Sequence, residues 1–261
     1  MNSIKKMMLS GALGCLISGM AYADGSSPQP AKPYWQDIQV VAVNKEKPRS
    51  SFMSYADRET ALTSRFEKSP YYSLLNGTWK FFFVDSYKDL PQNITDPSVN
   101  TSSWDDITVP GNWEVQGHGV AIYTNHGYEF KPRNPQPPLL PEANPVGVYR
   151  RDIEIPAGWD NRDIYLHIGG AKSGLYVYLN GKEVGYSEDS KNPAEFLINK
   201  YLQPGKNVLT LKIFRWSTGS YLECQDFWRM SGIERDVFLW SQPKANIQDF
   251  RVVSTLDDTY T

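Results

Sequence analysis

Acidic, basic and aromatic side chains are mixed in one segment of the chain, residues 215–237. Its acids are Glu223, Asp226, Glu234 and Asp236, and they stand among three arginines and four aromatic residues. A carboxylate accepts hydrogen bonds from hydroxyl groups and is a hard oxygen ligand for a hard cation. Aromatic side chains beside it can pack into a core or stack on a ligand. The mixture predicts a wall that packs on one side and presents oxygen ligands on the other.

A second polar position, Asn125, lies in residues 109–125 among aromatic neighbours. An asparagine amide can donate and accept hydrogen bonds towards one face of a ligand. Taken alone, Asn125 is more simply a turn residue, and Asp226 is more simply an ion-pair partner of Arg229 or Arg215. A binding role for either residue therefore needs support from elsewhere in the sequence.

Short β-strands are expected to position these residues. Between residues 74 and 240, brief runs alternate apolar and polar residues and are separated by Gly, Pro and Asn. The clearest runs are residues 79–83, 151–155, 164–168, 175–179, 183–186, 209–213 and 237–240. Asn180-Gly181, between two of them, is a strong hairpin signal. The spacing predicts an all-β sandwich or jelly roll, and no strand–helix–strand alternation indicates a TIM barrel.

Three other segments follow no strand period. Residues 24–33 are rich in Gly, Ser and Pro and are expected to be a flexible lead-in. Residues 34–70 are expected to wrap over the surface, with one short helix over residues 57–67. Residues 131–145 hold six prolines and must run extended, because proline fixes φ and removes a backbone donor. We expect a rigid surface loop there rather than a partner-binding arm.

The first residues have the pattern of a secretion signal. Lys5 and Lys6 precede an apolar run, and Ala21-Tyr22-Ala23 is a small–x–small cleavage pattern. The run is too short to span a bilayer, and no later run is long and apolar enough for a transmembrane helix. Residues 1–23 are therefore predicted to be a signal peptide of a secreted or periplasmic protein. A buried N-terminal helix and lipidation at Cys15 are the alternatives.

The net charge and the cysteine count limit the partners and the covalent bonds that this chain can have. The net charge is −2 and the isoelectric point is about 6.0, so no basic footprint for a nucleic acid is expected. Cleavage after Ala23 would leave Cys224 as the single cysteine, without a partner for an internal disulfide. No cationic pattern around Cys224 argues for an activated thiol, and we expect a packed, inert one.

Five sequence blocks resemble the β-galactosidases of glycoside hydrolase family 2, in the order in which that family has them. The blocks are residues 75–81, 109–125, 142–149, 184–190 and 215–237. They include Pro-Gly-Asn-Trp, Tyr-Thr-Asn and Gln-Asp-Phe-Trp-Arg-Met-Ser-Gly, and the resemblance as a whole covers about residues 36–253. The resemblance implies the N-terminal sugar-binding domain of that family, with a galactose-binding-like jelly-roll β-sandwich fold.

The resemblance also implies a site. Asn125 and Asp226 match two residues that reach from the first domain of the family into the galactose pocket and bind sugar hydroxyls. Asp226 additionally matches a residue that helps to hold a sodium ion. With the resemblance, the binding interpretation is favoured for both residues. Most aromatic residues are expected in the core, with Trp228 at most supporting the pocket.

The catalytic groups are expected outside this chain. Retaining glycoside hydrolysis uses two carboxyl groups about 5 Å apart. In the family these are glutamates of a barrel domain, which also holds the catalytic magnesium. The neighbouring carboxyls of this chain are Glu188 with Asp189, Glu223 with Asp226, and Asp105 with Asp106. None matches the family's catalytic motifs, so no residue here is assigned as catalytic and the chain alone is expected to be inactive.

One departure from the family pattern concerns a second, structural magnesium. Where the pattern has Asp after Arg-Trp-Ser, this chain has Thr218, and where it has Gln after Gly-Tyr-x, this chain has Glu188. The lost carboxylate puts that magnesium site in doubt here.

The expected organisation is a signal peptide (1–23), a linker and wrapping segment (24–70), a jelly-roll domain (71–242) and the first strand of a truncated immunoglobulin-like domain (243–261), with the strand over 245–254. The expected partners are a β-galactoside, the remaining domains of the same enzyme and, for the complete protein, further copies in a homo-oligomer. A free-standing carbohydrate-binding module is the alternative function. A β-glucuronidase or a β-mannosidase is the nearest enzymatic alternative.

Overall fold

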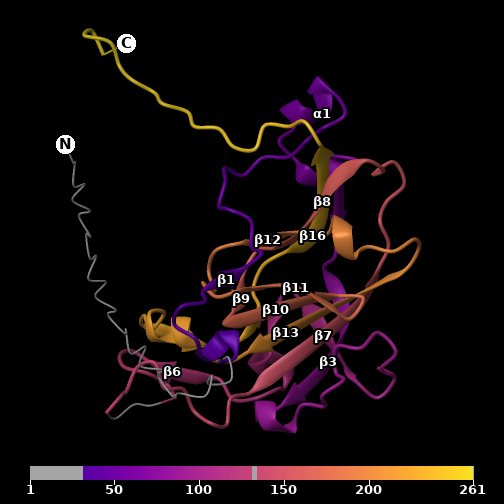
Figure 1. Cartoon of the computed structure of the whole chain (residues 1–261). Helices are drawn as coiled ribbons and strands as arrows, with labels where there is room; N and C mark the ends of the chain where they lie inside the picture. The colour runs from indigo at the N-terminus through magenta and orange to yellow at the C-terminus, as the bar shows by residue number, and fades with distance from the viewer. Residues whose placement is uncertain (1–31, 131–133, 261) are drawn as a thin grey trace, which may run out of the picture. The chain divides into compact units, whose positions relative to one another are not determined.

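Two antiparallel sheets form the body of the computed structural model, which describes residues 32–130 and 134–260 (Figure 1). The larger sheet contains β1 (Ala42–Val43), β3 (Gly77–Val84), β4 (Asp105–Val109), β7 (Val146–Ile153), β10 (Gly174–Leu179), β11 (Lys182–Ser187) and β13 (Asn207–Phe214). The smaller sheet contains β2 (Tyr72–Leu74), β8 (Arg162–Ile168), β12 (Ala194–Leu197) and β16 (Val237–Pro243). The strand orders are β1-β11-β10-β13-β7-β3-β4 and β12-β8-β16-β2. The predicted all-β sandwich is confirmed.

Smaller elements complete the fold around these sheets. A three-stranded sheet has the order β5-β15-β9, and a two-stranded sheet pairs β14 with β6. Their strands are β5 (Gly111–Asn112), β9 (Ala171–Lys172), β15 (Gly232–Ile233), β6 (Ile122–Thr124) and β14 (Phe227–Arg229). The helical elements are α1 (Arg58–Leu62) and six 3₁₀ turns, η1 (Tyr34–Gln36), η2 (Phe66–Lys68), η3 (Tyr87–Asp89), η4 (Glu114–Gln116), η5 (Asn199–Tyr201) and η6 (Thr218–Tyr221).

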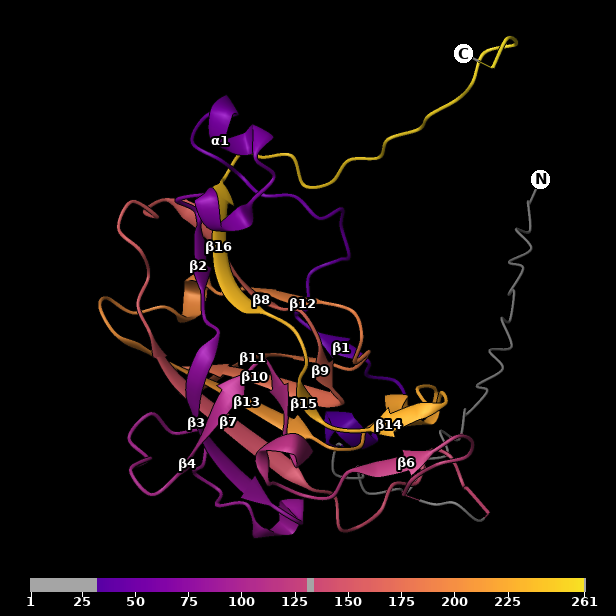
Figure 2. The ribbon, with the colours of Figure 1, turned by 180° about the vertical axis from the view of Figure 1, so that it is seen from behind.

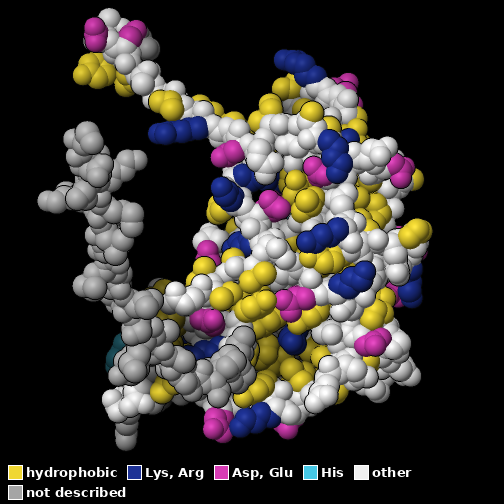
Figure 3. All heavy atoms as spheres, viewed as in Figure 1, with side chains coloured by type: hydrophobic (Ala, Val, Ile, Leu, Met, Phe, Trp, Pro, Cys, Tyr) yellow, Lys and Arg dark blue, Asp and Glu magenta, His cyan; other side chains and the backbone are white. Residues whose placement is uncertain are grey.

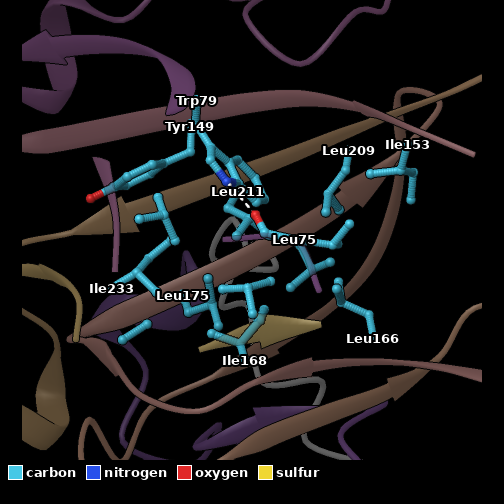
Figure 4. Packing of buried hydrophobic residues seen from close by; sticks show 14 of the residues in the cluster. Leu75, Trp79, Tyr149, Ile153, Leu166, Ile168, Leu175, Leu209, Leu211 and Ile233 are labelled. Atoms are coloured by element: carbon cyan, nitrogen blue, oxygen red, sulfur yellow. Dashed lines mark hydrogen bonds between the residues drawn. The ribbon is translucent and has the colours of Figure 1, made fainter. Parts of the chain in front are cut away.

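The main core lies between the two sheets (Figure 4). Trp79, Tyr149 and Leu211 from the larger sheet meet Leu166 from the smaller one, and all four are almost completely buried. The period of two that the sequence showed places these residues on one face of each strand. The Trp79 indole N–H donates to the carbonyl oxygen of Leu75 at 2.8 Å, so its one polar atom is satisfied inside the core.

Residues 34–70 wrap over the outer faces of the sheets, as predicted. Trp35 of η1 is buried against the outer face of the larger sheet. Farther along, Arg49 fastens the segment to the smaller sheet. Its guanidinium contacts both carboxylate oxygens of Glu195 at 3.0 Å and lies 4.2 Å from the Trp240 ring centroid. The wrapping segment therefore contributes to the fold and is not a loose leader.

The Asn180-Gly181 hairpin is formed as predicted, between β10 and β11. Both residues have positive φ, 54° for Asn180 and 77° for Gly181, which matches the turn that such a dipeptide favours. The Asn180 amide also donates to the carbonyl oxygen of Tyr201 at 3.0 Å and accepts from the Val208 backbone N–H at 2.9 Å. The turn is thereby tied to the neighbouring loop and to β13.

The helix predicted over residues 57–67 is wrong in length. α1 ends at Leu62, and a separate turn, η2, covers residues 66–68. Asp57 caps α1 by accepting from the Thr60 backbone N–H at 2.7 Å. Ser64, with φ of 55°, lies in the left-handed region and ends the helical path. Leu62 is 67% exposed, so the apolar side of this helix has no core to hold it.

The strand predicted over residues 245–254 is also wrong. After β16 the chain runs extended through residues 244–260 and pairs with no strand of the described residues. The segment is held near its start, where Asp249 accepts from the Ser50 backbone N–H at 2.8 Å. A strand needs a hydrogen-bonded partner, and this segment pairs with none of the described edge strands. The second domain that it was expected to open stays a prediction.

Self-association should follow from this exposed apolar segment. Val252 and Val253 are both fully solvated in the described structure, and an exposed apolar stretch favours contact between copies. Replacing both with Asp is expected to lower the apparent mass of the 261-residue chain in light scattering at high concentration. A wild-type chain that stays monomeric across a wide concentration range would contradict this.

The predicted signal peptide, with Cys15, lies outside the described residues, as do positions 24–31 of the lead-in and positions 131–133 of the proline-rich loop. Within residues 32–130 and 134–260, no helix has the length and apolar character needed to cross a bilayer.

Candidate functional site

A two-stranded sheet outside the sandwich brings Asn125 and Asp226 together. β6 pairs antiparallel with β14, with Thr124 opposite Phe227, and Figure 2 shows the two strands side by side. Asn125 follows the last residue of β6 and Asp226 precedes the first residue of β14, so both lie just beyond the same end of the paired strands. Both side chains are exposed. Two polar residues about a hundred positions apart in the sequence thus reach one surface point.

Tyr123 joins these two residues and was missed by sequence reasoning. Its hydroxyl donates to Oδ1 of Asp226 at 2.8 Å, and this hydrogen bond, with the Asp226 charge, raises the pKa of Tyr123. The Tyr123 ring lies 5.7 Å from that of Trp228, and the two are 55% and 54% exposed. The alternation of β-strand side chains could have found Tyr123, because it shares a face with Asn125.

The opposite surface of β14 is anchored by Arg229. This residue is buried, and its guanidinium donates to the carbonyl oxygens of Glu223 at 3.1 Å and of Thr124 at 3.4 Å. The second bond crosses to the last residue of β6, so Arg229 holds the two short strands together. A three-residue ladder has little stability of its own, and this cross-link helps to maintain its geometry.

The ion pair considered for Asp226 is not found among the described residues. Arg229 bonds to carbonyl oxygens, and Arg215 faces Glu114 at 3.4 Å and Glu129 at 3.9 Å. Asp226 instead receives the Tyr123 hydroxyl on Oδ1, and no described residue donates to its Oδ2. One carboxylate oxygen of Asp226 is therefore open to a ligand.

A buried charged cluster lies behind this sheet, and sequence reasoning did not predict it. Glu114 accepts from the Ser231 backbone N–H at 2.9 Å, and Glu129 accepts from the Trp216 indole at 2.5 Å. Burial raises the pKa of Glu114 and lowers that of the nearby Lys172. Glu114 follows Trp113 in one of the recognised blocks, but its partner Arg215 is too distant in sequence for spacing to show the pair.

The neighbouring carboxyls have structural partners. Asp106 forms an ion pair with Lys80 at 2.8 Å, and Glu223 accepts from the Ser190 backbone N–H and hydroxyl at 2.7 and 2.6 Å. Asp189 accepts from the Asn192 side chain at 2.9 Å. None of these arrangements leaves two free carboxyl groups facing a common space among the described residues.

Glu188 shows why the second magnesium does not fit here. Its buried carboxylate accepts from the Tyr186 hydroxyl at 2.7 Å, the Thr218 hydroxyl at 3.1 Å and the Gly219 backbone N–H at 2.6 Å. All three neighbours point hydrogens at the carboxylate, whereas a cation needs oxygen lone pairs. Among the described residues, no group of three His, Cys, Asp or Glu side chains is placed to hold a metal ion.

Replacing Glu188 with Gln should change how stability depends on pH. Burial raises the pKa of Glu188, although its hydrogen bonds oppose the change. A carboxyl with a raised folded-state pKa is most favourable below its unfolded pKa of about 4.3, and stability falls as pH rises through the folded value. A difference of one in pKa corresponds to about 1.4 kcal/mol.

Urea unfolding of both proteins between about pH 4 and about pH 8 checks this result. The wild-type free energy of unfolding should fall relative to the Gln variant as pH rises. The exposed Glu154→Gln serves as the matched control and should run parallel to wild type. Parallel curves for Glu188→Gln as well would show that Glu188 does not titrate in this range.

Cys224 is half-buried and free, and that its thiol is inert stays a prediction. Its thiol donates to the Ser220 carbonyl oxygen at 3.1 Å, and burial raises its pKa, which disfavours the thiolate. Trp113 and Trp216 are core residues, as expected for most of the aromatic side chains. Trp228 differs from them because its ring is exposed beside Tyr123.

Comparison with known proteins places these features in one family. The family model "Glycosyl hydrolases family 2, sugar binding domain" matches residues 72–243. The chain is 40% identical to a beta-galactosidase of Priestia megaterium over 238 residues, which are 90% of this chain and 23% of that protein. It is 39% identical to a beta-galactosidase of Psychromonas ingrahamii, over 85% of this chain and 21% of that protein.

Solved structures agree at the level of the fold. A beta-glucuronidase of an uncultured Clostridium species matches with a TM-score of 0.52 and 24% identity, over 72% of this chain and 31% of its own. A beta-glucuronidase of Bacteroides uniformis matches with a TM-score of 0.50 and 23% identity, over 66% of this chain and 18% of its own. The chain thus spans less than a third of any of these four proteins.

Proposed function

Because this chain belongs to the family 2 glycosyl hydrolases, as their sugar-binding domain, we propose that it forms part of the sugar pocket of a β-galactosidase. That enzyme would release terminal β-D-galactose with retention of configuration. The observation that carries the proposal is the pairing of β6 with β14, because Asn125 directly follows β6 and Asp226 directly precedes β14 at the same end of that pair. The choice of galactoside rests on the named relatives that match most of the chain.

Asp226 and Asn125 would divide the recognition of one sugar. The open oxygen of Asp226 would accept a hydrogen bond from a sugar hydroxyl, and the Asn125 amide would donate to or accept from another. The exposed Trp228 ring lies beside them and would support the apolar face of the pyranose. Tyr123 would hold the Asp226 carboxylate in place through its 2.8 Å hydrogen bond.

A sodium ion would share this site. The described residues supply one hard, open oxygen, on Asp226, which fits a monovalent cation as a single ligand. Its other ligands would come from elsewhere in the complete enzyme or from the sugar. Bound sodium would supply positive charge and fix the orientation of a hydroxyl group. The catalytic magnesium and the two catalytic glutamates would belong to the barrel domain of the complete protein.

Three alternatives have less support. A β-glucuronidase is suggested by the names of the structural neighbours, but these are at most 24–25% identical over two thirds to three quarters of this chain. The two β-galactosidases reach 39–40% over 85–90% of it. No comparison favours a β-mannosidase or a free-standing carbohydrate-binding module. Export to the periplasm or medium is proposed from the residues 1–23 pattern, and a homo-oligomer is proposed for the complete enzyme.

The proposal places substrate contacts in this chain and the catalytic carboxyl groups in another domain, and this separation can be tested directly. The purified 261-residue chain is expected to hydrolyse no chromogenic β-galactoside, because it carries no free pair of catalytic carboxyls. A longer protein from the same reading frame, with the barrel domain present, should hydrolyse the galactoside and discriminate against the glucuronide. Activity of the short chain that survives removal of host enzyme would refute this proposal. Preference of the long protein for the glucuronide would transfer the assignment to the first alternative.

A further inference from the structure

A groove of about 520 Å³ lies on the outer face of the larger sheet, and it shares no lining residue with the β6–β14 site. Its walls come from residues 32–35 and 90–95, and its floor from side chains of β10 and β13. Figure 3 shows this face of the molecule, where apolar side chains line a hollow over these strands. Ligand pockets have volumes in this range and are lined mainly by aromatic residues with a few polar groups.

The floor of the groove carries an ammonium group without a polar partner. Nζ of Lys212 lies 4.7 Å from the ring centroid of Tyr176 and 5.3 Å from that of Tyr178. Its contacts are therefore with aromatic faces, and it forms no ion pair or hydrogen bond with any described residue. Burial lowers the pKa of Lys212. A ligand that supplies oxygen lone pairs would satisfy this donor.

A carboxylate of opposite charge faces the same groove. Glu183 is exposed and accepts a hydrogen bond from the Tyr178 hydroxyl at 3.3 Å. An anionic ligand beside Lys212 would be repelled by Glu183, and a cationic ligand would be repelled by Lys212. A neutral polyhydroxyl ligand satisfies both groups, because one hydroxyl oxygen can accept from the ammonium while another hydroxyl donates to the carboxylate.

Three tyrosines of the groove have near-parallel rings. The Tyr34 and Tyr176 rings lie 5.7 Å apart with an interplanar angle of 10°, and those of Tyr176 and Tyr178 are inclined by only 13°. Tyr176 and Tyr178 are buried beneath Tyr34 and Lys212, whereas Tyr34 is only half-buried and gives the groove an apolar surface. The apolar face of a pyranose packs on such surfaces while its hydroxyls reach polar groups at the edge.

We propose that this groove binds a neutral saccharide, as a second carbohydrate site besides the pocket proposed at Asn125 and Asp226. Lys212 donates to a sugar hydroxyl oxygen, Glu183 accepts from a hydroxyl, and the half-buried Tyr34 supports the ring. The site holds sugar without cleaving it, because the groove brings no second carboxyl group to Glu183.

The test is a titration of the ¹⁵N-labelled 261-residue chain with lactose, followed by NMR. Saturable shifts are expected for the backbone amides of residues 90–95 and 176–178 and for Nζ of Lys212. Lys212→Met, which keeps the length of the side chain, should weaken lactose binding in the groove at least about tenfold. Glu183→Gln should weaken it several-fold. The matched control is Lys206→Met, at an exposed lysine paired with Asp152, and its affinity should equal that of wild type.

Three results would overturn the proposal. The first is the absence of saturable shifts at the groove amides up to the solubility limit of lactose. The second is equal groove affinity in wild type and in a folded Lys212→Met variant. The third is tighter binding of sodium galacturonate than of lactose, which would show an anion site. Asp226→Ala should leave the groove affinity unchanged, so failure of the β6–β14 assignment and failure of this one are distinguishable.

Discussion

Asp226→Ala in the complete enzyme is expected to lower kcat/KM for a β-galactoside at least about tenfold, because it removes a charge-assisted hydrogen bond to the sugar. Sodium dependence should weaken or vanish in the same variant, since the open Asp226 oxygen is the cation ligand that this chain supplies. The fold should persist, because Asp226 is exposed and its one described hydrogen bond is from Tyr123. Steady-state kinetics with and without added sodium, alongside thermal unfolding, measure all three effects.

Companion variants separate the roles at this site. Asp226→Asn keeps an oxygen ligand without the charge and should fall between wild type and Asp226→Ala. Asn125→Ala should cost activity and leave the sodium response intact. Asp105→Ala, at another exposed acid on this chain, is the control and should behave as wild type. Wild-type kcat/KM and sodium response in a folded Asp226→Ala enzyme would remove the site assignment and leave the family membership untouched.

Arg215→Met is expected to lower the free energy of unfolding by about 3–5 kcal/mol, the cost of leaving buried carboxylates without their cation. The Arg215, Glu114 and Glu129 side chains are 4%, 0% and 4% exposed, so water cannot replace the lost partner. The substitution also removes hydrogen bonds from the guanidinium to the carbonyl oxygens of Val120 and Arg229, which flank the site strands. We therefore expect the β6–β14 pair to be destabilised together with the rest of the fold.

Urea denaturation of the 261-residue chain measures the loss, and Arg251→Met, at an exposed arginine, is the matched control. Adding Glu114→Gln to Arg215→Met should restore part of the stability, because one uncompensated charge is then gone. An effect of Arg215→Met no larger than that of Arg251→Met would show that the cluster is not strongly coupled. If Glu114→Gln does not restore stability, the loss caused by Arg215→Met comes from lost packing and not from an uncompensated charge.

The sandwich could be predicted from local patterns because each strand or turn is indicated by the residue types within a few positions. The alternation in residues 79–83 and 209–213 and the Asn-Gly turn at 180–181 each act within a few residues, and the structure realises all of them. The predictions were wrong for segments that need a partner distant in sequence in order to form a strand or a longer helix. Residues 245–254 were expected to form a strand but pair with no described strand, and Leu62 on the apolar side of α1 is exposed.

Only some residues of the candidate site could be predicted from the sequence. Resemblance pointed to Asn125 and Asp226, and in the structure they flank the same end of the β6–β14 pair. Tyr123 and the Arg229 cross-link to β6 depend on the register of that sheet, which no local pattern specifies. The pairing of Arg215 with Glu114 joins residues from separate blocks inside a low-dielectric interior. Such contacts follow from the assembled fold and leave no periodic trace in the chain.

The β6–β14 sheet gives the site a distinctive place in the order of folding. Its strands are three residues long, and the Tyr123–Asp226 bond closes a separation of 103 positions. The sandwich strands between positions 123 and 226 must pair first, because their pairing brings β6 and β14 close together. We therefore expect β6 to pair with β14 only after the sandwich has formed. The backbone amides of β6 and β14 should therefore exchange hydrogen with solvent faster than those of β7 and β13. A bound sugar would select the paired form, and its affinity would report the fraction of molecules already closed.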